Sequence, residues 1–264
     1  MAVPEEERPA LRLNVERLYR RFSLPVTDFD CGLLCAPHNP NRIPVCCDIC
    51  HAVPAAYRQE WEYLQAHTDL WHPWRGDECA ADPSDPALLL DQTPEHMLLL
   101  ACLGPEHCQR QYRAVSCRQF PFFPYISSKD RFLGLAYDWD FEDRCWVISH
   151  LGAVSDAFRR EFVDIFDELL AVWYEEYESY ANLSEDMRLH FATQRRRIPL
   201  LHRNGGIYLL SPGSERLQRL PPERLPRFGP YCEKSSPSRA TDHSNSSLYL
   251  ADCWDLSEPF GVHE

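Results

Sequence analysis

The chain has no long hydrophobic run. No stretch reaches the ~18 uninterrupted apolar residues that a membrane-spanning helix needs. Residues 1–20 lack an apolar core of the length that a secretory signal peptide requires. The sequence also lacks a glycine-rich nucleotide loop, a clear Ser/His/Asp arrangement and internal repeats. We therefore expect a soluble, cytoplasmic protein.

Positive charge is scarce. The chain has 27 Lys and Arg residues against 40 Asp and Glu residues, which gives a formal net charge of −13. A chain with this charge repels nucleic acid and anionic membrane surfaces. We therefore expect no nucleic acid and no membrane among its partners. A metal ion or a basic protein partner fits the charge better.

Glycine is scarce as well, with 10 residues against 22 prolines, and this favours fixed turns over long regular elements. The apolar pattern predicts an α+β fold, mostly helical, with irregular cysteine-rich loops and short hairpins. The cysteines discussed below add the expectation that a metal stabilises this fold. Helices are expected in residues 5–22, 54–67, 93–102, 155–180 and 184–197, and hairpins in residues 131–149 and 203–220. Two prolines in residues 120–125 exclude a central strand there.

The same pattern suggests three regions along the chain. Residues 1–150 are expected to form a cysteine-cluster metal-binding domain. Residues 151–230 are expected to form a helical extension with a hairpin. Residues 231–264 are polar and low in apolar content, so a flexible tail is expected there.

Cysteine is the residue that the chain has in excess, with 12 copies. Cytosolic thiols stay reduced and disulfides are rare there, so metal ligation is the leading explanation. The expected ligands form two clusters and one later position: Cys31, Cys35, Cys46, Cys47 and Cys50; then Cys102, Cys108 and Cys117; and finally Cys145. Closely spaced loop cysteines can turn their sulfurs toward one ion at about 2.3 Å. The isolated Cys79, Cys232 and Cys253 are expected to be small buried hydrophobes.

The adjacent residues Cys46 and Cys47 leave the number of metals open. In an extended backbone their side chains point to opposite sides. Both can bind one metal only if the backbone turns, and otherwise they serve two metal positions. A multinuclear centre and a single four-thiolate site with spare cysteines are therefore both compatible with the sequence.

Charged neighbours of the cysteines complete the predicted site. A four-thiolate centre around a divalent ion carries a charge of about −2, which needs a counter-charge close by. Arg118 follows Cys117 directly and is the expected counter-charge, although it could instead stack on an aromatic ring. His51 and His107 also lie next to cysteines, where each is either a substitute ligand or a solvent-facing side chain.

These residues resemble the zinc- or iron-chelating domain proteins, also called YkgJ-like cysteine-cluster proteins. Cys31, Cys35 and the pair Cys46-Cys47 look like the N-terminal cysteine group of that family. Cys102 and Cys108 look like its middle cysteines, Cys145 sits where a last cysteine often lies, and residues 112–122, Tyr-Arg-Ala-Val-Ser-Cys-Arg-Gln-Phe-Pro-Phe, resemble its closing motif.

The resemblance covers roughly residues 28–150. The chain departs from the family pattern in the long Cys35-x10-Cys46 spacing and in the extra Cys50, which leaves open which of Cys46, Cys47 and Cys50 bind. The resemblance implies a zinc or iron centre, with an iron–sulfur cluster as one form of it. It implies a site more than a particular reaction.

Three functions compete at this stage. The first is a metal-binding protein that serves structure, metal handling or electron transfer. The second is an iron–sulfur-dependent enzyme, because flagellin lysine methylases are similar in the cysteine region. The third is an interaction module with a structural zinc, in which acidic residues of the long helix, among them Glu168, Glu175 and Glu176, either bind a basic partner or form a solvated face.

Overall fold

The computed structural model describes residues 13–79 and 86–232 of the chain. Helices and strands contribute together to its architecture, and the described residues form a three-stranded and a five-stranded antiparallel sheet. The fold is therefore α+β, but the prediction of a mostly helical chain is wrong. Short apolar runs fit a strand as well as a helix, and several of those in this chain pair as strands. None of the described helices has the length and apolar character needed to cross a membrane.

The N-terminal part surrounds the small sheet, in which β3 lies between β1 and β2. Its elements in chain order are α1 (Val15–Arg21), α2 (Gly32–Cys35), β1 (Ala55–Tyr57), α3 (Arg58–His67), β2 (Trp71–Pro73), α4 (Pro86–Gln92), β3 (Met97–Cys102) and α5 (Val115–Gln119). The helix predicted for residues 93–102 is instead the central strand β3, because its backbone pairs on both sides. Thr93 lies at the end of α4, where its hydroxyl donates to the Leu89 carbonyl.

The larger sheet has the strand order β4-β5-β6-β7-β8. Its strands are β4 (Phe122–Ile126), β5 (Phe132–Tyr137), β6 (Ile198–His202), β7 (Ile207–Leu210) and β8 (Leu217–Leu220). The hairpin predicted in residues 203–220 is confirmed as β7 and β8. The hairpin predicted in residues 131–149 is wrong, since β5 pairs with β4 and the later residues form 3-10 turns. Pro124 lies in the edge strand β4, in agreement with the exclusion of a central strand there.

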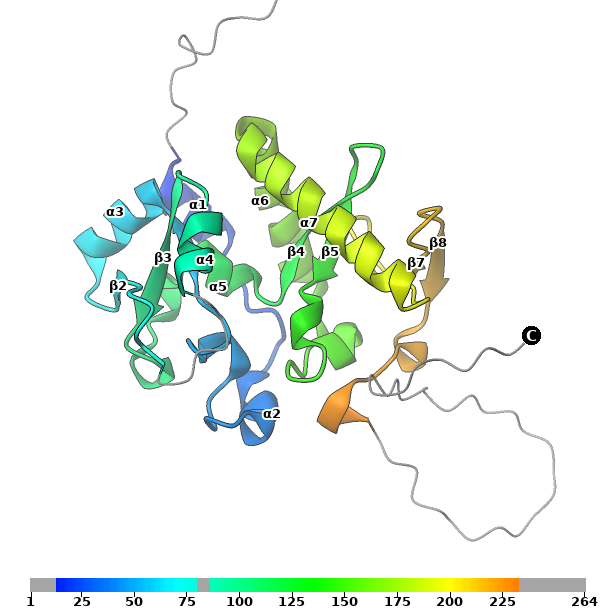
Figure 1. Ribbon diagram of the computed structural model, residues 1–264, viewed down its shortest axis with the longest axis horizontal. Helices are drawn as coiled ribbons and strands as arrows, with labels where there is room; N and C mark the ends of the chain where they lie inside the picture. The colour runs from blue at the N-terminus through cyan, green and yellow to red at the C-terminus, as the bar shows by residue number, and fades with distance from the viewer. Residues whose placement is uncertain (1–12, 80–85, 233–264) are drawn as a thin grey trace, which may run out of the picture.

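Two helices cover this sheet, α6 (Asp156–Val172) and α7 (Tyr174–Thr193), and both contact strands of the β4–β5 hairpin (Figure 1). The single helix predicted through residue 180 is wrong, because the extended backbone of Trp173, with φ −113° and ψ 108°, separates the two. No new helix begins after Ser184. That side chain is buried inside α7, where its hydroxyl accepts from the Ile126 N–H at 2.9 Å.

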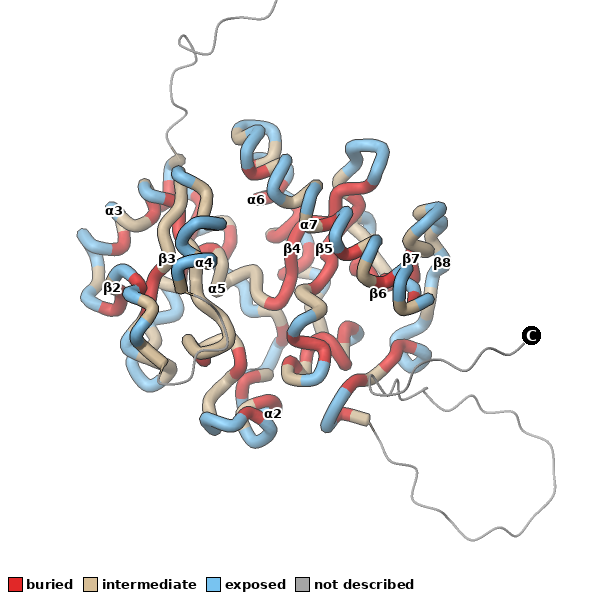
Figure 2. The backbone as a smooth tube through the Cα atoms, in the orientation of Figure 1, coloured by how far each residue is buried: buried red, intermediate tan, exposed pale blue. Residues whose placement is uncertain are grey.

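The hydrophobic core links the two halves of the described chain. Buried residues follow strands β4 and β5 and continue into the helices beside them (Figure 2). One cluster includes Leu18 of α1, Phe162 of α6 and Tyr231 near the end of the described residues. The five-stranded sheet takes two strands from before residue 150 and three from after it, so the suggested boundary at residue 150 falls between strands of one sheet.

Gly134 of β5 is expected to tolerate no side chain. Its φ is +150°, and a Cβ placed there would lie 2.1 Å from the Leu201 carbonyl oxygen of the paired strand β6. The backbone atoms of β6 are held by the hydrogen bonds of the sheet, so they cannot move away from the new Cβ without loss of stability. We expect Gly134→Ala to lower the free energy of unfolding by about 2–3 kcal/mol, as measured by urea denaturation. Gly213→Ala is the control, because nothing lies within 4 Å of a Cβ built there.

Candidate functional site

Five of the predicted ligand cysteines line one cavity of about 230 Å³. They come from three segments that are far apart in the sequence: Cys46 and Cys47, Cys102 and Cys108, and Cys117. Cys102 ends strand β3, and Cys117 lies in the short helix α5. The fold therefore brings together thiols from both predicted clusters.

Cys46 and Cys47 belong to a 3-10 turn, η3 (Val45–Cys47), rather than to an extended segment. The turn allows both side chains to line the same cavity, with their sulfur atoms 3.9 Å apart. The buried carboxylate of Asp48 holds the loop beside it, because it accepts hydrogen bonds from the side-chain amides of Asn39 and Asn41. The backbone turn that one shared site requires is thus present.

Three other predicted ligands do not line this cavity, although Cys35 lies near Cys47, and Cys145 lies near Cys46. Among the described residues that line the cavity, Cys31, Cys35 and Cys145 do not occur. Cys35 and Cys145 are each 5 % exposed. Burial raises the pKa of Cys145 to about 12, and the thiols of Cys35 and Cys31 near it contribute to the shift.

Cys50 is bonded to Cys79 in a disulfide. In the structure it therefore offers no thiolate to a metal, although the sequence placed it among the ligands. Cys79 is accordingly not the isolated buried thiol that was expected. The sulfur of Cys232 donates to the Arg227 carbonyl at 3.2 Å, and Cys253 lies outside the described residues.

The donor set fits a thiophilic metal, because thiolates are preferred ligands of zinc and of iron–sulfur clusters. The donors do not yet enclose a metal position on all sides. Within residues 13–79 and 86–232, no three His, Cys, Asp or Glu side chains are already arranged to hold an ion. The cavity thus supplies suitable sulfur donors, but these are not already arranged as the tetrahedral ligands of a bound ion.

Arg113, not Arg118, is the cation that faces the thiols. The Nε of Arg113 donates to the sulfur of Cys108 at 3.2 Å, and Arg113 lines the cavity. Arg118 instead donates to backbone carbonyls, among them those of Phe22 and Gln111, and its guanidinium lies 4.0 Å from the centre of the Tyr19 ring. The aromatic stacking that the sequence left open for Arg118 is what the structure shows.

The two adjacent thiols differ in acidity. Contact with the Cys46 sulfur and the nearby Arg113 guanidinium lower the pKa of Cys47 to about 7, against the effect of burial. The contact with Cys47, together with burial, raises the pKa of Cys46. Burial also raises the pKa of Cys102 and of Cys117. The Cys46–Cys47 pair is therefore the first part of this thiol group to lose a proton, and the remaining negative charge is shared by a contact between the two sulfurs.

The neighbouring histidines do not line the cavity formed by the described residues. His51 lies with its Nε2 4.0 Å from a carboxylate oxygen of Asp48. His107 ends a 3-10 turn whose residues are not buried. The structure thus gives neither histidine the position of a substitute ligand.

A buried carboxyl group, which the sequence did not single out, supports the helix that carries Cys117. Glu60 is fully buried and accepts hydrogen bonds from the Tyr19 hydroxyl at 2.6 Å and from the Val115 N–H at 2.7 Å. Val115 begins α5, so Glu60 connects α1, α3 and α5. Its sequence position, inside an amphipathic helix, gave no sign of this role.

The pH dependence of stability should report on Glu60. Burial raises its pKa to about 7 from 4.5, although hydrogen bonds from Tyr19, Val115 and Tyr57 and the nearby Arg118 oppose the shift. A carboxyl with a raised folded-state pKa stabilises the fold fully below pH 4.5, and this contribution is lost as the pH rises through 7. In the wild type, the free energy of unfolding should therefore decline by about 3 kcal/mol between pH 4.5 and pH 7. We expect Glu60→Gln to remove this decline. Urea denaturation at several pH values measures it, and an unchanged pH profile in Glu60→Gln contradicts the assignment.

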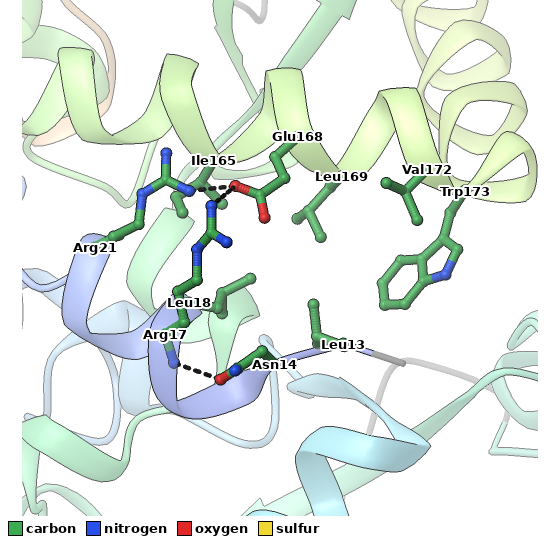
Figure 3. Close-up of a pocket in the computed structure, with 10 residues that line it drawn as sticks. All are labelled: Leu13, Asn14, Arg17, Leu18, Arg21, Ile165, Glu168, Leu169, Val172 and Trp173. Carbon is green, nitrogen blue, oxygen red and sulfur yellow. Dashed lines mark hydrogen bonds and ion pairs between the residues drawn. The ribbon is translucent and has the colours of Figure 1, made fainter. Parts of the chain in front are cut away.

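A second cavity, of about 240 Å³, lies between α1 and α6 (Figure 3). Its floor is apolar, and at its rim Arg17 and Arg21 both point to Glu168. The lining residues include no cysteine or histidine. The cavity therefore offers neither a thiol nor an imidazole for catalysis or for binding a soft metal.

The acidic side chains of the long helical region are largely engaged within the chain. Glu168 pairs with Arg17 and Arg21, and Asp167 pairs with Arg203. Glu176 is buried and its carboxylate lies 3.1 Å from the His96 Nε2. Two of the three glutamates named for docking a basic partner thus have partners of their own.

Comparison with known proteins adds no relative, because no family model, no curated protein and no solved structure matches the chain.

Proposed function

We propose that the chain is a metal-binding protein that holds zinc or iron, the latter as an ion or an iron–sulfur cluster, in its cysteine cavity. The observation that carries the proposal is that thiols from three distant segments line one cavity. Cys46, Cys47, Cys102, Cys108 and Cys117 are the candidate ligands. Buried free cysteines are often only small hydrophobes, but five around one open space need another explanation.

The charges around the cavity support this proposal. Metal binding replaces the protons of cysteine thiols, so thiols with raised pKa values release protons when a metal enters. The guanidinium of Arg113, in contact with Cys108, offsets part of the negative charge that the thiolates then carry. A cytoplasmic setting belongs to the proposal, because the ligand cysteines must remain reduced, and the Cys50–Cys79 disulfide would be an exception there.

The direct test is the metal content of the protein purified without oxygen. We expect at least one equivalent of zinc or iron per chain by elemental analysis, and visible absorbance if an iron–sulfur cluster is present. Metal removal by a chelator should make the cavity thiols reactive toward a thiol reagent. A folded protein that carries no metal, and whose thiols react equally with and without added zinc or iron, would refute the proposal.

A further inference from the structure

The cysteine cavity is larger and more open than a structural metal site. A structural zinc is enclosed by four ligands at about 2.3 Å, whereas catalytic sites keep one position open for a small molecule. Here the thiols line a cavity of about 230 Å³. An apolar cavity of about 150 Å³ is large enough to bind benzene. The space therefore exceeds what an ion alone requires.

Part of the cavity wall carries no metal ligands and is apolar. It includes Ile43, Ile49, Leu70, Trp71 and Leu103. Leu70 and Trp71 are 2 % and 8 % exposed, and the Trp71 indole donates to the Tyr112 carbonyl at 2.8 Å, which fixes its ring. This surface is thus held in place by the fold, as in pockets that bind apolar groups of small ligands.

Arg113 supplies the positive charge of this cavity, as the only cationic side chain among the described residues that line it. Its Nε donates to the sulfur of Cys108, and its charge also acts on Cys46 and Cys47, while its two Nη groups have no hydrogen-bond partner among the described residues. A guanidinium can bind a carboxylate with two parallel hydrogen bonds. The lining of the cavity by the described residues contains no carboxylate that would compete for it.

We propose that the cavity also binds a small organic acid, whose carboxylate pairs with Arg113 and whose short apolar or aromatic body packs against Trp71 and Leu70. The inference rests on the proposed metal function and extends it. A metal that shares its cavity with a small organic acid would take part in a reaction or in sensing that acid, and would not serve the fold alone. The apolar wall accounts for the body of the ligand, and the unpaired Nη groups account for its charge.

Benzoate is a suitable probe, with benzyl alcohol as its neutral counterpart. We expect calorimetric titration of the metal-loaded full chain to show saturable binding of benzoate, at least tenfold tighter than that of benzyl alcohol. Arg113→Gln should weaken benzoate binding at least tenfold. Metal content is measured on every preparation, so that loss of metal and loss of ligand binding are told apart.

A second variant keeps the test valid if Arg113→Gln loses its metal. Leu103 is 56 % exposed at the cavity, and Leu103→Asp places a negative charge there without disturbing the core. It should weaken benzoate binding at least tenfold, whereas Leu189→Asp, at a 59 % exposed position of α7, should leave it unchanged. Metal-loaded protein that does not bind benzoate, or binds it equally in Leu103→Asp and Leu189→Asp, overturns this inference alone. Protein without metal overturns the proposed function as well.

Discussion

Cys117→Ser is expected to remove most of the bound metal and to destabilise the protein at the same time. Cys117 lies in α5 and lines the cavity together with thiols from the other two segments. In a thiolate site the free energy of metal binding is also free energy of folding. We expect the metal content to fall below half of the wild-type value and the midpoint of thermal unfolding to fall by about 10 °C, a loss of about 3–5 kcal/mol.

The matched control is Cys232→Ser. Cys232 does not line the cavity, and a serine hydroxyl can keep its hydrogen bond to the Arg227 carbonyl. We expect its metal content to equal that of the wild type and its midpoint to shift by less than about 2 °C. Equal losses in both variants would show that the division of the cysteines into ligands and structural thiols is mistaken.

Arg196→Met should be the most damaging change outside the cavity. Arg196 and Glu142 are 2 % and 3 % exposed and form two hydrogen bonds, of 2.6 and 2.8 Å, while the Tyr137 hydroxyl also donates to Glu142. The substitution leaves the carboxylate buried without its cation. Breaking a buried ion pair in this way costs about 3–5 kcal/mol, which urea denaturation can measure.

Two further variants test this explanation. Arg197→Met changes the next residue, which is exposed, and should shift stability by no more than about 0.5 kcal/mol. The double variant Glu142→Gln with Arg196→Met removes the buried charge together with its partner and should be more stable than Arg196→Met alone. If the double variant is instead the less stable of the two, burial of an unpaired charge is not the cause.

Prediction from the sequence failed where local pattern and tertiary pairing conflict. The apolar run at 97–102 follows Thr93-Pro94, a good helix start, yet it forms the central strand of a sheet. Helical periodicity continues past Trp173, yet the backbone breaks there. Arg196 belongs to a run of three arginines just beyond α7, yet its side chain reaches Glu142 in the core. For β3 and for Arg196, the partner lies far away in the sequence.

The sequence by itself determined which side chains are candidates for chemistry, because most of its cysteines gather in two short segments. It also determined the β7–β8 hairpin, whose pairing depends on a short local turn. Only the tertiary structure decided which thiols share a cavity, that Arg113 rather than Arg118 faces them, and that Cys50 pairs with Cys79. These are contacts between distant segments, and spacing along the chain carries no information about which of them packing will bring together.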